Sequence, residues 1–128
     1  MITIDPQQEL FTALKLRFED KGYKVFDSLP GEDEPYPFIF LGETRQTDQS
    51  TKGAIIGTVN QDLQIWHTAK NRGTLSGIML EVKQVCRELT KTSNFTWAVR
   101  SISGVIRNDR TTATPLIFGD MTIEFLYS

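Results

Sequence analysis

Residues 54–67, AIIGTVNQDLQIWH, decide the fold, because apolar and polar side chains alternate along them. The positions on one face are Ile55, Val59, Leu63 and Ile65, and those on the other are Thr58, Asn60, Asp62 and Gln64. This alternation is typical of a strand with one face toward a core. At about 3.3 Å per residue the stretch would span roughly 46 Å, whereas a usual strand has about five or six residues. A strand this long must bend or project beyond the domain.

The segments that precede this strand predict a β-hairpin. Residues 38–41, FIFL, are apolar on both faces and indicate a covered strand. Gln46–Gly53 contains no apolar residue, so burial cannot offset the entropy of ordering it. We interpret this polar segment as a mobile tip that joins the two strands.

Two segments have the spacing of amphipathic helices. The first runs from about Pro6 to Lys21: Asp5 is its N-cap, Gln8 has capping-box spacing and Gly22 ends it. The second follows Thr74 as N-cap and reaches Leu89. The apolar stripes are Leu10, Phe11, Leu14 and Phe18 in the first helix and Leu75, Ile78, Met79, Val82, Cys86 and Leu89 in the second.

The remaining strands complete an α+β domain. They are expected at Tyr23–Phe26, from Phe95 to about Arg107, and at Leu116–Tyr127. The order α-β-β-β-α-β-β predicts a mostly antiparallel sheet with both helices on one face, in a single domain over residues 1–128. Leu14, Phe18, Val82 and Cys86 should be buried, and Lys15, Arg17, Gln84 and Arg87 should be exposed.

Composition excludes several classes of protein. The chain has 128 residues, 39% of them hydrophobic, and a formal charge of −2, which is not the charge of a typical nucleic-acid-binding protein. One Cys and one His exclude an internal disulfide and an ordinary Cys/His zinc site. Nothing in residues 1–6 marks the chain for secretion, and we expect no contact with a membrane.

Charge is distributed unevenly along the chain. Residues 1–65 carry six basic and eleven acidic side chains, whereas residues 66–128 carry eight basic and five acidic ones. Part of the acidity lies in one loop, at Asp27, Glu32, Asp33 and Glu34. This loop is either an ordinary solvated connection or a charged patch that meets an oppositely charged surface.

The side chains that usually carry catalysis are few. His67 ends a strand on the same face as Ile65, and Cys86 lies on an apolar helical stripe, so both are expected to pack in or near the core. Ser50, Ser101 and Ser103 lie in no Gly-x-Ser-x-Gly elbow, and no phosphate-binding loop or dinucleotide fingerprint is present. We therefore expect no enzymatic activity, no metal and no cofactor.

Two motifs carry a resemblance to a known family. Residues 35–43, PYPFIFLGE, lead into the polar segment, and residues 63–67, LQIWH, lead through a turn into the second helix. In this order, from about Leu10 to Leu126, the sequence resembles the tail-completion and tail-terminator proteins of long-tailed bacteriophages and prophages. The last third of the chain matches in pattern more than in residues.

The resemblance implies a structural role in the virion. Such proteins form a ring, commonly a hexamer, at the head-proximal end of the tail after assembly in the host cytoplasm. The implied partners are further copies of the chain, the tail tube protein and the head connector or head-completion protein, and DNA would pass through the channel without specific binding. Neighbouring neck or minor tail proteins, and a small non-viral protein-interaction module, are the alternatives.

The resemblance also suggests which residues take part in assembly. The candidate assembly or channel loop is Gln46, Thr47, Asp48, Gln49, Ser50, Thr51, Lys52 and Gly53. Asp48 and Lys52 in this loop have opposite charges, which would avoid holding passing phosphates. The candidate interface residues are Glu32, Asp33, Glu34, Arg107 and Arg110.

Overall fold

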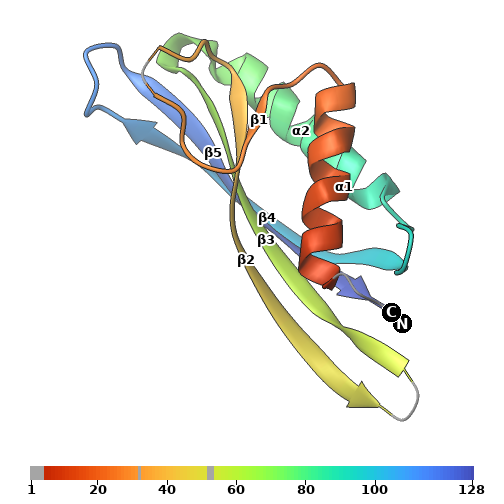
Figure 1. Ribbon diagram of the computed structural model, residues 1–128. Coiled ribbons are helices and arrows are strands. Elements are labelled where there is room, and N and C mark those ends of the chain that lie inside the picture. The colour runs from red at the N-terminus through yellow and green to blue at the C-terminus, as the bar shows by residue number, and fades with distance from the viewer. Residues whose placement is uncertain (1–4, 32, 52–53) are drawn as a thin grey trace.

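The computed structural model describes residues 5–31, 33–51 and 54–128. Its elements, in chain order, are α1 (Pro6–Asp20), β1 (Val25–Phe26), β2 (Phe38–Thr51), β3 (Ala54–Thr68), the short 3-10 helix η1 (Ala69–Asn71), α2 (Arg72–Glu88), β4 (Trp97–Asp109) and β5 (Leu116–Tyr127). This is the predicted α+β class with the predicted order (Figure 1).

Within the described residues, five strands form one sheet in the order β1-β2-β3-β5-β4. β1 pairs parallel to β2, and the other neighbouring strands pair antiparallel. The last strand, β5, therefore lies between β3 and β4. α1 and α2 cover the same face of the sheet, as predicted (Figure 1). The opposite face carries no helix in the described part of the chain.

The N-terminal helix begins where the sequence predicts. Asp5 has extended backbone angles and its carboxylate accepts the N–H of Gln7 at 3.4 Å, while Pro6 occupies the first turn. Gln8 turns its side-chain amide to Thr12 at 3.3 Å, so it does not complete the expected capping box. Beyond the cap residue Lys21, Gly22 has φ +95, a backbone conformation that favours glycine.

The second helix begins earlier than predicted. The prediction of Thr74 as its N-cap is wrong, because α2 starts at Arg72 and continues directly from η1. Asn71 occupies the cap position, but its side-chain amide donates to the hydroxyl of Thr68 and makes no capping bond to the helix. The end of η1 and the first turn of α2 therefore take the place of an open turn at residues 70–73.

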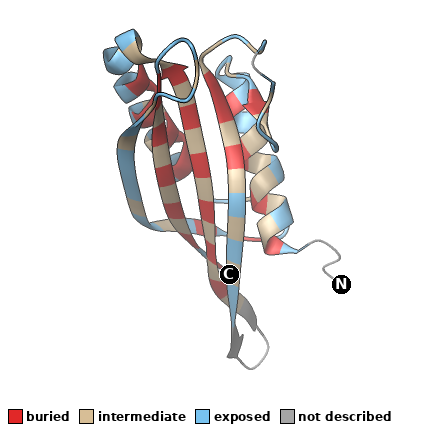
Figure 2. Ribbon diagram, turned by 90° about the vertical axis from the view of Figure 1, so that its left-hand side faces the viewer, coloured by how far each residue is buried: buried red, intermediate tan, exposed pale blue. Residues whose placement is uncertain are grey.

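The core lies between the helices and the covered face of the sheet. Leu14, Phe18, Val82 and Cys86 are fully buried, as predicted. Arg17, Gln84 and Arg87 are exposed, whereas Lys15 is only half-exposed and pairs with Glu19 at 3.5 Å. The sheet contributes Ile39, Leu41, Val59, Leu63, Ile65, Ile117, Met121, Ile123 and Phe125 to the same core. Figure 2 shows the resulting alternation of buried and half-buried positions along the central strands.

A β-bulge changes which side chains of β2 face the helices. The pairing with β3 shifts between Leu41 and Thr44, so two residues of β2, Gly42 and Glu43, lie opposite one residue of β3, Asp62. Odd-numbered residues face the core before the bulge, as Leu41 does, and even-numbered residues do so after it. The polar end of β2 thereby turns Thr44 toward α1, where its hydroxyl donates to the side chain of Gln7 at 3.2 Å.

None of the helices in the described residues combines the length and apolar character needed to cross a membrane.

The packing of α1 predicts that two nearby leucines, Leu14 and Leu16, contribute very differently to stability. Leu14 is fully buried in the core, whereas the side chain of Leu16 is 61% exposed on the same helix. Leu14→Ala should lower the free energy of unfolding by about 2–5 kcal/mol through lost transfer energy and a residual cavity. Leu16→Ala should change it by about 0.5 kcal/mol or less. Urea titrations of both variants measure the difference, and equal effects would contradict the packing described.

Candidate assembly surface

The β2–β3 hairpin projects beyond the rest of the sheet (Figure 1). β5 pairs with β3 only as far as Gly57, which lies opposite Tyr127. Past that level, within the described residues, β2 and β3 pair only with each other, from Gln49 opposite Ile56 to Thr51 opposite Ala54. At about 3.3 Å per residue, this projecting tip of residues 49–51 and 54–56 extends roughly 10 Å beyond the body of the sheet.

The prediction that Gln46–Gly53 is a loop is wrong for its first six residues. Gln46–Thr51 belong to β2 and pair with β3, from Gln46 opposite Val59 to Thr51 opposite Ala54. Lys52 and Gly53 lie outside the described residues, as do the side chains at 49–51. Backbone hydrogen bonds between strands do not require apolar side chains, so a polar composition did not exclude a strand here.

Three polar side chains join the hairpin to the core at its base. The hydroxyl of Tyr127 donates to the carboxylate of Asp48, and the side-chain amide of Gln46 donates to the same carboxylate at 2.7 Å. Burial, with the adjacent Asp48 carboxylate, raises the pKa of Tyr127 to about 12, while the hydrogen bonds from Tyr127 and Gln46 lower the pKa of Asp48. We call these three residues the latch. They fix the direction of the projecting tip relative to β5.

The latch depends on a glycine. A Cβ atom at Gly57 would lie 2.7 Å from the Tyr127 hydroxyl and 3.0 Å from Cα of Asp48, and it would clash with the carbonyl of Thr47. The sequence analysis missed the latch, although a glycine inside an alternating strand is a signal of close approach by another group.

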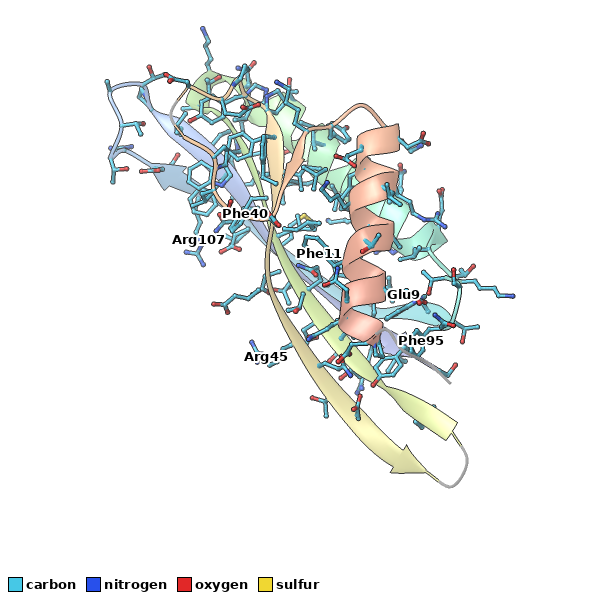
Figure 3. All side chains as sticks on the ribbon, in the orientation of Figure 1. Glu9, Phe11, Phe40, Arg45, Phe95 and Arg107 are labelled. Atoms are coloured by element: carbon cyan, nitrogen blue, oxygen red, sulfur yellow. The ribbon has the colours of Figure 1, made fainter. Side chains whose placement is uncertain are left out.

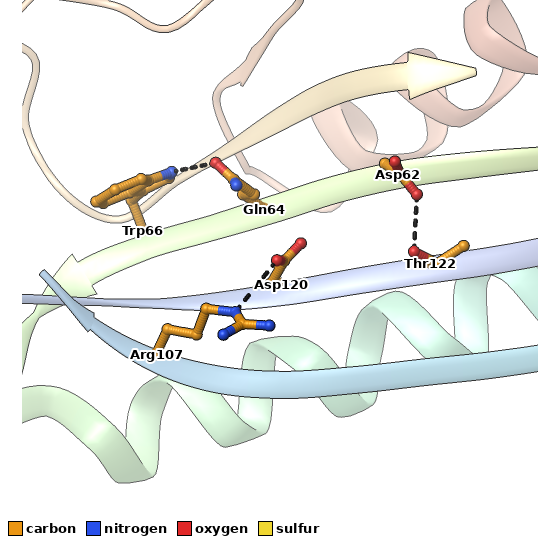
Figure 4. A network of polar contacts seen from close by, with 6 residues as sticks. All are labelled: Asp62, Gln64, Trp66, Arg107, Asp120 and Thr122. Atoms are coloured by element: carbon orange, nitrogen blue, oxygen red, sulfur yellow. Dashed lines mark hydrogen bonds and ion pairs between the residues drawn. The ribbon is translucent and has the colours of Figure 1, made fainter. Parts of the chain in front are cut away.

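The sheet face away from α1 and α2, which we call the open face, carries a row of polar contacts (Figure 4). Thr122 donates to Asp62 at 2.7 Å, and the indole N–H of Trp66 donates to Gln64 at 3.1 Å. The Nε atom of Arg107 on β4 lies 3.5 Å from Oδ2 of Asp120 on β5. The side chains involved are half-buried or exposed.

The open face also has charged and aromatic groups outside this row. Arg100 pairs with Glu124 at 3.4 Å, and Trp66 stacks on Phe118 with 4.4 Å between ring centroids. Figure 3 shows Arg45 and Arg107 extending from the side of the sheet away from α1. Arg100 and Arg107 thus each pair with a half-buried acidic neighbour on β5 while their own side chains remain exposed.

The described loop residues among the predicted interface, Asp33, Glu34 and Arg110, lie at the end of the molecule opposite the hairpin tip (Figure 1). The loop between β1 and β2 meets the loop between β4 and β5 there, because Tyr36 lines one surface pocket with residues 112–114 and Leu116. Asp33 and Arg110 are exposed, and Glu34 pairs with Lys24 at 3.1 Å. Glu32 lies outside the described residues. The structure thus brings the Asp33 loop near the segment after Arg110, while Arg107 lies on the open face.

The residues weighed as catalytic groups occupy separate places. His67 is almost fully buried, its Nδ1 accepts the N–H of Thr68 at 2.8 Å, and burial lowers its pKa. Burial raises the pKa of the Cys86 thiol to about 12. Ser101 and Ser103 are exposed on β4, and the side chain of Ser50 lies outside the described part. Among the described residues, no three His, Cys, Asp or Glu side chains form a group that could hold a metal.

One buried polar side chain was not anticipated from the sequence. Gln61 is fully buried on the core face of β3, beside the β-bulge. Its amide donates to the carbonyls of Asp62 at 2.7 Å and Gly42 at 3.4 Å, whereas its Oε1 has no partner among the described protein atoms. The amide thus supplies a donor to the Gly42 carbonyl at the point where the bulge disrupts regular pairing.

Comparison with known proteins supports the fold. No protein-family model matches the sequence, and no curated protein sequence matches it either. The structure is similar to a chain of a solved assembly titled "Virion of native gene transfer agent (GTA) particle", with a TM-score of 0.64 and 13% sequence identity. The alignment covers 95% of this chain and 93% of that chain. The two chains share a fold.

The close approach at Gly57 predicts the effect of a single methyl group. Gly57→Ala should displace Tyr127 from Asp48 and lower the free energy of unfolding by about 1–3 kcal/mol through overpacking. Gly77→Ala is the matched control, because no atom lies within 4 Å of its added Cβ on α2, and alanine is favoured over glycine in a helix by about 0.5–1 kcal/mol. Thermal unfolding measures the stability of both variants. A Gly57→Ala variant as stable as the wild type would show that the base of the hairpin can relax.

The buried imidazole of His67 predicts a pH dependence of stability. Because burial lowers the pKa of His67 in the folded chain, folding favours the neutral ring. Its contribution is therefore fully present above the ordinary pKa of 6.5 and is lost as the pH falls below it. Between pH 7.5 and 5.5, wild-type stability should fall more than that of His67→Gln in paired urea titrations. Parallel pH profiles would contradict this role of His67.

Proposed function

We propose that this chain is a structural protein of a phage-like virion, and specifically a tail-terminator or tail-completion protein. The observation that carries the proposal is a fold shared over 95% of the chain with a chain of a gene transfer agent virion. The sequence resemblance to tail-completion and tail-terminator proteins supports the same role independently. In this role the chain is not an enzyme and needs no cofactor.

The proposed working form is a ring, most simply a hexamer, at the head-proximal end of the tail. A closed ring needs a heterologous contact, in which one surface of a subunit meets a different surface of its neighbour. The sheet provides two different outer strands for such a contact, β4 on one side and β2 with the short β1 on the other. The tail tube protein and the head connector would bind the two ends of the ring, and DNA would pass through its channel.

The projecting tip is the proposed contact element for a neighbouring subunit or the tail tube. The tip lies beyond the reach of β5 and of the core, so its pairing adds little to the body of the domain. The latch nevertheless holds its base in a fixed direction. A rigid projection allows a small domain to contact surface that its core cannot reach.

Removing the tip tests this role. Asp48 and Gly57 lie opposite each other, so the segment between them can be replaced by an Asn-Gly turn that closes a two-residue hairpin. The shortened chain should keep its melting temperature within a few degrees. In a phage or prophage lacking the gene, it should give at least tenfold fewer active particles, with tails of uncontrolled length or heads without tails in electron micrographs.

A length-preserving variant, Gln49→Ser with Thr51→Ser, is the control and should restore particles. Full complementation by the shortened chain would show that the tip is only a connector. Gold labelling of a tagged subunit separates the terminator from other virion proteins, because label at the head-proximal tail end is expected. Label elsewhere would indicate a neck or minor tail protein, and normal virions without the gene would refute a virion role.

A further inference from the structure

Because of the fold, the uneven distribution of charge along the sequence places an acidic excess on one side of the sheet and a basic excess on the other. α1 packs on β1 and β2, whereas α2 packs on β3, β5 and β4, so the first half of the chain forms one side and the second half the other (Figure 1). The acidic excess of residues 1–65 and the basic excess of residues 66–128 therefore occupy opposite sides.

Exposed side chains on each side define two flanks. The acidic flank comprises Asp20 at the end of α1, Asp27 after β1 and Glu43 at the bulge of β2. Asp27 and Glu43 make no ion pair within the described residues. The basic flank comprises Arg100, Arg107 and Arg110 in and after β4, which are exposed. The acidic residues beside them, Asp109, Asp120 and Glu124, are half-buried, so the arginines dominate the outer surface.

The arginines of the basic flank remain available to a partner. Arg100 and Arg107 each use Nε for an acidic neighbour on β5, yet their side chains are 62% and 58% exposed. A guanidinium has five N–H donors, so each arginine keeps free donors that face solvent. Arg110 is exposed and makes no ion pair in the described part of the chain.

Both flanks end in a strand whose outer edge is largely uncovered. β1 pairs with β2 only at Ile39 and Phe40, so the edge of β2 from Leu41 to Thr51 has no partner strand among the described residues. β4 is 13 residues long and, among the described strands, pairs with β5 alone. Neither strand contains a proline, and each has one β-bulge, near Glu43 in β2 and at Arg100 in β4, so regular edge pairing is available on either side of the bulges.

The directions of β2 and β4, and the positions of their charged residues along the strands, are compatible with contact between the edge of β4 in one copy and the edge of β2 in another. β2 and β4 run in opposite directions, because three antiparallel pairings separate them. A rotation about an axis along the strands keeps these directions, so it brings β4 of one copy antiparallel to β2 of the next. Glu43 lies across the sheet from Ser103, at a level between Arg100 and Arg107.

We propose that the basic flank of one copy binds the acidic flank of a second copy, with β4 antiparallel to the free edge of β2. Each copy then presents one flank to each of two neighbours, which is the heterologous contact that a ring requires. This inference rests on the proposed ring-forming function and assigns its subunit contact.

Two charge-reversed variants test the assignment. Arg107→Glu/Arg110→Glu makes both flanks acidic, and Asp27→Lys/Glu43→Lys makes both basic. Each variant alone should lose at least tenfold in self-association relative to the wild type, because like charges then meet at every contact. An equimolar mixture should recover assemblies in which the two variants alternate. Light scattering after size-exclusion chromatography measures the mass against multiples of 14.6 kDa.

A third variant controls for general charge attraction. Arg72→Glu/Arg87→Glu changes exposed positions on α2 and carries the same net charge as Arg107→Glu/Arg110→Glu. It should self-associate as the wild type does, and mixing it with Asp27→Lys/Glu43→Lys should give no alternating assembly. Equal assembly in the two mixtures, undiminished association of either flank variant alone, or a wild type that stays monomeric at millimolar concentration would overturn the assignment.

Particle assembly separates this inference from the proposed function. Co-expression of the two flank variants should restore active particles in a strain lacking the gene, and neither variant alone should do so. If the wild type restores particles and the pair does not, the flank assignment is wrong and the virion role stands. If particles form normally without the gene, the virion role itself is wrong.

Discussion

The burial of α1 and α2 against one face of a single sheet is the constraint on which the rest of the structure depends. Leu10, Leu14 and Phe18 from α1 and Leu75, Val82 and Cys86 from α2 are fully buried against that face. Because the helices cover one face only, the other face and both outer strands remain available for partners. The surfaces proposed for assembly are thus those that the core leaves uncovered.

The hairpin extends the same strand pattern beyond the core. The pairing of β2 with β3 continues to Thr51 and Ala54, but past Gly57 no third strand among the described residues lies beside β3. Order there depends on backbone pairing and on the latch at Asp48 and Tyr127. The projecting tip is therefore a separable element, whose removal leaves the apolar contacts of the core intact.

Much of the fold could be predicted from side-chain periodicity. The start of α1 at Pro6, the bounds of β5 and the four stripe residues Leu14, Phe18, Val82 and Cys86 follow from spacing alone, because burial depends on it. The strand structure of Gln46–Thr51 could not be predicted from spacing, because backbone pairing between strands places few demands on side-chain composition. The start of α2 was also misjudged, since Asn71 and Gly73 favour turns as readily as a first helical turn.

The candidate site was harder to predict, because its parts are brought together by pairing between distant strands. Asp48 and Tyr127 are far apart in the sequence, and the position of β5 between β3 and β4 is not visible from the order of elements. The bulge after Leu41 also reverses which residues of β2 face α1. The uneven charge was visible in the sequence, but its division between two flanks required the topology.

The position of β5 has a consequence for biosynthesis. The strand that separates β3 from β4 follows both of them in the sequence, so among the described strands β3 can pair only with β2, and β4 with none, until β5 has been made. Pairing between segments far apart in sequence is slow, and until it occurs one edge of β3 has no partner strand among the described residues. A chain without β5 would leave that edge free and would not join the basic strand β4 to the sheet that carries the acidic flank. Competence for assembly is thereby tied to the pairing of β5 with β3 and β4.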